Sequence, residues 1–198
     1  MPLFLWFAAQ IGAIALAAAR VPLWSQSPPA GEQLALAYVL AVQIAVSALL
    51  FPQLLHTLRT TIVVIATAWP LALLATFLAD ALIANFIVAQ TYVTLWLIAL
   101  HLWARLLNNP AHQPYASAIA SMLAFGGALL FYLHLDYGNS SPTRFWPGEL
   151  LAGPIIGAIS QTIPPKTSPI SWAFPLLFLS LALAATFVKR SARSTKIG

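Results

Sequence analysis

The run from Thr60 to Ala104 contains one charged residue, Asp80, which divides it into two apolar halves. Each half is long enough to cross a bilayer, because about 20 apolar residues at about 1.5 Å rise each span the hydrocarbon core. A charge is costly at the bilayer centre but can lie at the interface, so we expect Asp80 to occupy a tight turn there. The sequence therefore predicts a transmembrane helical hairpin around which the other helices pack.

The composition supports the same environment. Hydrophobic residues make up 61% of the 198-residue chain and charged residues only 7%. Because soluble domains have about 25% charged residues, we expect an all-α, polytopic integral membrane protein. The net charge is +5, but the basic residues are scattered except in the last ten positions, so we expect no nucleic-acid partner. The absence of cysteine excludes disulfides, thiolate metal sites and a cysteine nucleophile.

Six apolar segments, separated by connections with proline, glycine or polar residues, predict about six transmembrane helices in one domain, residues 1–198. The first segment ends in Ala17-Ala18-Ala19, which resembles a signal-peptide cleavage site. It lacks a preceding positively charged region apart from the amino terminus, so we expect it to be retained. The predicted helices cover residues 3–19, 34–55, 60–79, 81–106, 115–135 and 171–188, and a polar basic tail follows at 189–198.

Residues 136–170 form the one long segment outside the predicted helices. It carries six prolines around an apolar stretch, Leu150–Ser160. That stretch is too short to span a membrane and too apolar for an ordinary solvated loop, so we expect a re-entrant or interfacial segment between helices five and six. Long loops in compact proteins are often functional. The alternative is a lid that only covers the helix ends.

The distribution of charge predicts the orientation. Six helices place both termini on one side, and that side has six basic residues against three on the other: Arg59, Arg105, Lys189, Arg190, Arg193 and Lys196 against Arg20, Arg144 and Lys166. By the positive-inside rule, both termini are cytoplasmic. The four acidic residues, Glu32, Asp80, Asp136 and Glu149, fall on the outer side. We expect a multi-pass protein of a cell inner (plasma) membrane.

The predicted helix 81–106 carries the clearest polar stripe in the chain. Its members are separated by four, seven and four residues and project from nearly one side of the helix: Gln90, Thr94, His101 and Arg105. Polar groups that face lipid are costly, so the stripe is expected to face other helices or a wet cavity. The alternative is a local hydrogen-bond network with no further role.

The four histidines are the candidate haem or metal ligands. His56 and His101 are the one pair that can face each other near the cytoplasmic side, which makes them the haem candidates; the alternative is a packed, hydrogen-bonded His101. No acidic residue lies within a predicted helix interior, and no phosphate-binding loop is present. We therefore expect no enzymatic activity, no metal site and no bound cofactor outside the haem alternative.

The six spans, the short cytoplasmic connections and the long apolar outer segment resemble the topology of ABC-2-type exporter permeases, including the small haem-exporter-like ones. The resemblance covers the whole chain but includes no sequence motif, and the connection at 54–60 lacks the acidic coupling element common in such permeases. It implies a dimeric transporter subunit driven by a separate ATPase.

A second hypothesis is a non-catalytic membrane anchor or accessory subunit of a larger respiratory, photosynthetic or assembly complex. Few interior polar groups and seams of small residues suit such packing against partners. A membrane-embedded enzyme is a third hypothesis.

Overall fold

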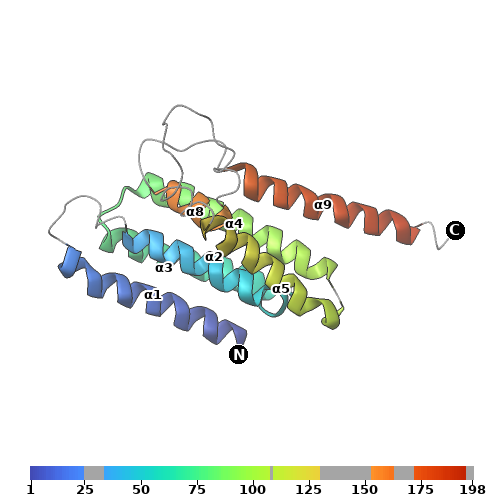
Figure 1. Cartoon of the computed structure of the whole chain (residues 1–198), viewed down its shortest axis with the longest axis horizontal. Helices are drawn as coiled ribbons and strands as arrows, with labels where there is room; N and C mark the ends of the chain where they lie inside the picture. The colour runs from blue at the N-terminus through green and yellow to red at the C-terminus, as the bar shows by residue number, and fades with distance from the viewer. Residues whose placement is uncertain (25–33, 108, 130–152, 163–171, 195–198) are drawn as a thin grey trace.

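The computed structural model describes residues 1–24, 34–107, 109–129, 153–162 and 172–194, and these ranges are helical with no strand (Figure 1). The prediction of an all-α fold is confirmed. The predicted end of helix five at 130–135, most of the outer segment 136–170 and the last part of the tail, 195–198, lie outside the described residues. The longest helices are α1 (Pro2–Trp24), α2 (Leu34–Leu54), α3 (Leu58–Leu78), α4 (Ile83–Leu106) and α9 (Ala173–Ser194).

Within the described residues, four helices, α1 to α4, are long and apolar enough to cross a membrane. The apolar part of α9, Ala173–Lys189, is shorter. Large apolar side chains remain exposed on several helices, including Phe4 at 72%, Phe77 at 66% and Phe187 at 68%. Such faces suit lipid rather than water, which supports the membrane class.

The turn between α3 and α4 is a Schellman motif centred on Asp80. Asp80 has a left-handed backbone with a φ of 47°. Its N–H donates to the carbonyl of Phe77 at 3.4 Å, and the N–H of Ala81 donates to the carbonyl of Thr76 at 3.1 Å. This pattern satisfies carbonyls that the end of a helix leaves unpaired. The hairpin predicted from the sequence therefore reverses at its one charged residue.

α2 is the central helix, in contact with α1, α3, α4, α5 and α8. α1 turns one narrow face toward the bundle, with buried residues spaced by four, three and four positions: Trp6, Gln10, Ala13 and Ala17. This spacing repeats every turn of a helix, and the small alanines allow close approach. The core therefore forms around α2, with α1 covering one side.

α8 (Gly153–Ser160) is a short helix buried beside α2 and α4. It also packs against a π-helical turn, η2 (Met122–Gly126), which follows α5 (Gln113–Ser121). Gly153, with a φ of 72°, lies so close to this turn that a Cβ atom would be 2.6 Å from the carbonyl oxygen of Leu123. A Cβ at Gly157 would overlap the hydroxyl of Tyr92 on α4. The two glycines let α8 sit against its neighbours.

α9 packs chiefly on α4. The contact is aromatic: the ring centroids of Trp96 and Phe178 are 5.1 Å apart, and those of Trp103 and Phe178 are 5.7 Å apart. Phe174 lies 6.1 Å from Trp96 by the same measure. This stack holds α9 along one side of the bundle (Figure 1).

α9 continues through Ser194 and so includes the first part of the predicted polar tail, 189–198. Lys, Arg and Ala have favourable helix propensities, and extending an existing helix costs far less than starting one. The extension places Lys189 on a helix, where it can take part in a defined site.

Candidate functional site

The predicted polar stripe of α4 does not form one site. Gln90 and His101 are buried, Thr94 is half-buried, and Arg105 is exposed at the end of the helix. The Thr94 hydroxyl donates to the carbonyl of Gln90 at 2.8 Å and accepts from Nε1 of Trp69 at 3.2 Å. Gln90, Thr94 and His101 therefore pack within the bundle, and Arg105 lines a cavity.

His101 connects α4 to the turn between α2 and α3. Its Nδ1 atom lies 2.6 Å from the carbonyl oxygen of Leu55 and 2.9 Å from the hydroxyl of Thr61. Because a carbonyl oxygen only accepts, Nδ1 carries the hydrogen. The Thr61 hydroxyl in turn donates to the carbonyl of Thr57 at 3.0 Å. His101 thus pairs a carbonyl just past the end of α2, where the helix itself supplies no donor.

The two haem candidates lie in different environments. His56 is exposed in the α2–α3 turn, whereas only 6% of His101 is exposed. Within the described residues, no group of three or more His, Cys, Asp or Glu side chains is placed to hold a metal ion. With Nδ1 bonded to Leu55, the ring nitrogen of His101 left for a ligand is Nε2. Haem ligation by His56 and His101 stays a prediction.

Three glutamines on three membrane-length helices form a second polar feature. Gln10 of α1, Gln43 of α2 and Gln90 of α4 are all fully buried. Nε2 of Gln43 donates to the carbonyl of Ala68 at 3.1 Å. Its Oε1 atom and both side-chain polar atoms of Gln10 and Gln90 find no hydrogen-bond partner in the described part of the chain. An unsatisfied buried polar group costs about 1–3 kcal/mol.

Sequence reasoning missed Gln10, although a signal was available. It is the one polar side chain among residues 1–19, in an otherwise apolar and alanine-rich helix. Sequence reasoning also missed Tyr92, whose fully buried hydroxyl has no partner in the residues that the structure describes. An isolated polar residue in an apolar helix is the pattern to examine, because lipid offers it no hydrogen bond.

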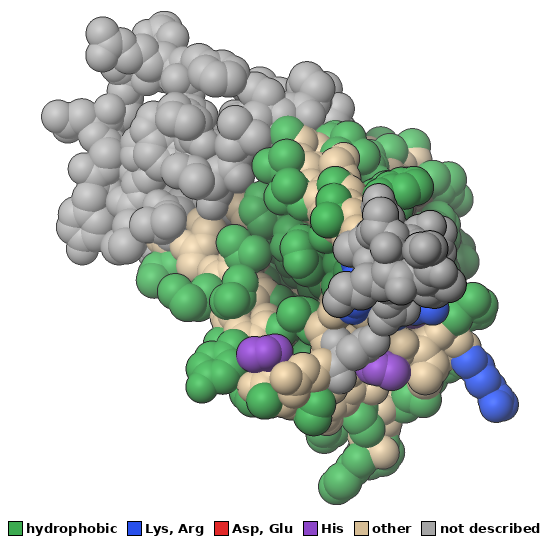
Figure 2. All heavy atoms as spheres, turned by 90° about the vertical axis from the view of Figure 1, so that its right-hand side faces the viewer, with side chains coloured by type: hydrophobic (Ala, Val, Ile, Leu, Met, Phe, Trp, Pro, Cys, Tyr) green, Lys and Arg blue, Asp and Glu red, His purple; other side chains and the backbone are tan. Residues whose placement is uncertain are grey.

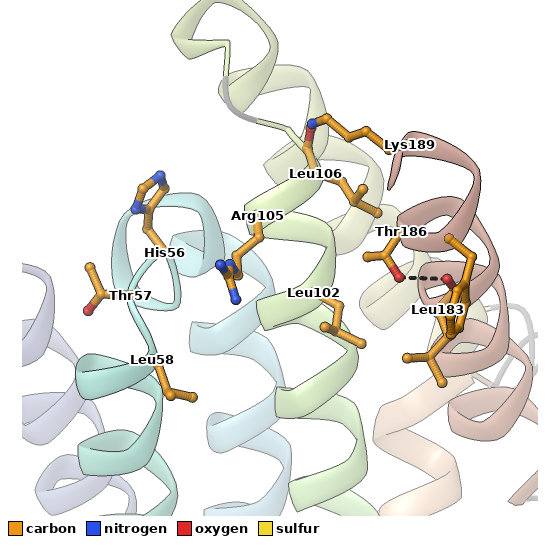
Figure 3. A pocket seen from close by; sticks show the side chains of 10 residues that line it. His56, Thr57, Leu58, Leu102, Arg105, Leu106, Leu183, Thr186 and Lys189 are labelled. Carbon is orange, nitrogen blue, oxygen red and sulfur yellow. Dashed lines mark hydrogen bonds between the residues drawn. The ribbon is translucent and has the colours of Figure 1, made fainter. Parts of the chain in front are cut away.

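A third feature is an open cavity of about 760 Å³ between the α2–α3 turn, α4 and α9, which we call the α4–α9 cavity (Figure 3). Lys189 reaches from α9 to the end of α4, where its Nζ atom donates to the carbonyl of Leu106 at 3.0 Å. The sequence predicts His56, Arg105 and Lys189 on the same side of the membrane, with Lys189 in the polar tail. The cavity is lined by His56, Thr57, Leu58, Leu102, Arg105, Leu106, Leu183, Thr186, Phe187 and Lys189.

This end of the bundle is basic. Seen from it, basic and histidine side chains are in view among hydrophobic ones, and no acidic side chain appears on the visible described surface (Figure 2). The single acid of the described ranges is Asp80, at the opposite end of α3 and α4. Cations here therefore have no carboxylate from the described residues to pair with.

A smaller cavity of about 410 Å³ is lined by residues of α2, α4, α5 and α9. Its lining is mostly apolar and includes Phe51, Trp103, Tyr115, Ile119 and Phe178. It offers space and few polar contacts.

No family model, no curated protein and no solved structure matches this chain.

Proposed function

We propose that this chain is the membrane-domain subunit of a transporter, similar in topology to ABC-2-type exporter permeases and driven by a separate ATPase subunit. The observation that carries the proposal is the set of unpaired carboxamide atoms of Gln10, Gln43 and Gln90, buried in three membrane-length helices. In a static scaffold these unpaired atoms would lower the stability of the fold and serve no function. A transporter changes its packing, so groups buried in one state can meet water or substrate in another.

The proposal gives the chain no chemical reaction of its own, because ATP hydrolysis would belong to the partner. An accessory subunit of a larger complex is the competing function. That function needs no second packing state, so it predicts that the glutamines stay buried under all conditions. The two functions therefore differ in a property that can be measured without knowing a substrate.

Cysteine labelling of the buried glutamine positions tests the proposal, since the chain has no native cysteine. Gln43→Cys and Gln90→Cys variants in native membranes are expected to react with a membrane-permeant maleimide severalfold faster in one nucleotide state than in another. The comparison is between ATP with vanadate and no nucleotide. Leu40→Cys is the matched control, because Leu40 is equally buried on α2 but apolar, and its labelling should stay slow throughout.

Equal, slow labelling of Gln43→Cys and Gln90→Cys in every nucleotide state would contradict the transporter proposal and favour the accessory subunit. Equal acceleration at Leu40→Cys would indicate general loosening of the bundle instead of a polar path. Mass spectrometry of a gently solubilised complex should also identify a nucleotide-binding subunit.

We further propose six spans in a bacterial inner membrane, with cytoplasmic termini and α8 as part of a re-entrant segment from the outer side. Support comes from the ends of the helices: the start of α1 and the end of α9 lie at one end of the bundle, opposite the α3–α4 turn (Figure 1). Arg105 and Lys189 lie at the first end and Asp80 at the other. By the positive-inside rule the first end is cytoplasmic.

Single cysteines on the two connections of α4 test this orientation. In intact cells, a membrane-impermeant maleimide is expected to label Leu82→Cys and to leave Ala111→Cys unlabelled, with both labelled after permeabilisation. Leu82 is 62% exposed, and it avoids the left-handed backbone of Asp80, which disfavours most side chains. The reverse pattern would place the termini outside the cytoplasm.

A further inference from the structure

The α4–α9 cavity brings together basic groups from three separate elements. His56 comes from the α2–α3 turn, Arg105 from α4 and Lys189 from α9. Lys189 donates one hydrogen bond to the carbonyl of Leu106. The Arg105 guanidinium makes no hydrogen bond or ion pair within the described residues. Asp80, the one acid of those residues, lies in the α3–α4 turn, at the opposite end of α4 from Arg105. The cavity thus has positive charge without a counter-charge from the described chain.

Apart from Thr57 and Thr186, the remaining residues that line the cavity are apolar. Leu102 of α4 and Leu183 and Phe187 of α9 line it, and Phe187 is largely exposed. The next residue, Val188, is also 69% exposed. A basic group at the helix ends beside an apolar wall along the helices matches an amphiphilic anion, with a charged head and a hydrocarbon chain.

The depth of the basic groups identifies the class of anion. Arg105 is the penultimate residue of α4, and Lys189 is the last residue of the apolar part of α9. Both therefore lie where membrane helices reach the headgroups. Guanidinium binds phosphate oxygens in a bidentate fashion, and an ammonium adds a point charge. Phospholipids place a phosphate at this depth and acyl chains beside the helices.

We propose that the α4–α9 cavity binds an anionic phospholipid, with its phosphate on Arg105 and Lys189 and an acyl chain along Leu183 and Phe187. Such a lipid would bridge the end of α4 to α9 and supply the missing negative charge. The inference rests on the membrane location of the chain and does not depend on the transport proposal. A free phosphate shares the headgroup chemistry but cannot use the apolar wall.

The test compares lipids on the purified full chain in a neutral detergent. Phosphatidylglycerol is expected to raise the apparent melting temperature more than phosphatidylcholine with the same acyl chains, because a ligand stabilises the state that binds it. Native mass spectrometry should show a severalfold preference for phosphatidylglycerol. The preference should fall toward one in Arg105→Gln and in Lys189→Gln, and Arg105→Lys should retain part of it.

Arg59→Gln is the matched control, because Arg59 is exposed near the same turn but does not line the cavity. It should keep the preference. Three results would overturn the proposal. The first is no lipid preference in the wild-type chain, which is the result expected if an acidic protein occupies the cavity. The second is an equal loss of preference in Arg59→Gln, and the third is equal stabilisation by inorganic phosphate, which would assign the cavity to a free anion. If Arg105→Gln does not fold, the loss in Lys189→Gln decides the outcome.

Discussion

Replacing Gly153 with alanine is expected to lower the apparent melting temperature of the purified protein by on the order of 10 °C. Two costs add at this position. A left-handed backbone costs a residue with a Cβ about 1–2 kcal/mol, and overpacking costs about 1–3 kcal/mol more. The new methyl group would lie 2.6 Å from the carbonyl oxygen of Leu123. Because that atom belongs to the backbone, no side-chain rotation relieves the overlap, and α8 has to move.

Gly126→Ala is the matched control for this experiment. Gly126 lies in η2, the same π-helical turn that α8 contacts, but a Cβ there would meet nothing within 4 Å. The melting temperature of the Gly126→Ala variant should stay near that of the wild type, or rise slightly because alanine favours the helical conformation. The measurement is fluorescence-detected size-exclusion chromatography after heating. Equal melting temperatures for Gly153→Ala and the wild type would show that α8 does not rest against this turn.

Replacing His101 with leucine is expected to lower the free energy of unfolding by about 1–3 kcal/mol. It removes the 2.6 Å donor to the Leu55 carbonyl and leaves that oxygen only the longer bond from the Thr61 hydroxyl, at 3.4 Å. The loss falls on the α2–α3 turn, which His101 ties to α4. Asparagine can place an N–H donor near the position of Nδ1, so His101→Asn should recover part of the stability. Denaturant-induced unfolding of the purified chain measures both values.

A double-mutant cycle with Thr61→Val separates the local bond from a wider effect. The coupling energy between His101 and Thr61 is expected to lie between about 0.5 and 3 kcal/mol, as for residues that share one network. Strictly additive losses would mean that the 2.9 Å contact of Nδ1 with Thr61 contributes nothing to stability. The visible spectrum of the same samples tests the haem hypothesis: a Soret band in the wild type, lost in His101→Leu, would support ligation by His101.

The hairpin could be predicted from the sequence because a bilayer imposes strict demands on composition. The apolar runs on either side of Asp80 have few other environments in which they are stable, and a charge between them fixes the turn. The extension of α9 to Ser194 could not be read in this way. Its basic residues suit solvent in either a helix or a tail, and the choice depends on a helix already formed beside them.

The candidate site was predictable only in part. Spacing along one helix showed that Gln90 and His101 share a side of α4, because that geometry is local. The partners of His101 lie elsewhere in the chain, Leu55 in the α2–α3 turn and Thr61 on α3. The side-chain amide of Gln90 has no hydrogen-bond partner among the described residues. Long-range pairing of this kind, including the meeting of Lys189 with Leu106, depends on tertiary packing that no single segment encodes.

The aromatic contact between α4 and α9 also has a consequence for biosynthesis. Trp96 and Trp103 leave the ribosome well before Phe178, because chains are made from the N-terminus. During that interval the ring faces that later contact Phe178 have no α9 to cover them. The docking of α9 then covers this face of α4. Since α9 forms one wall of the α4–α9 cavity, a nascent chain acquires that cavity only after α9 has been synthesised and has docked.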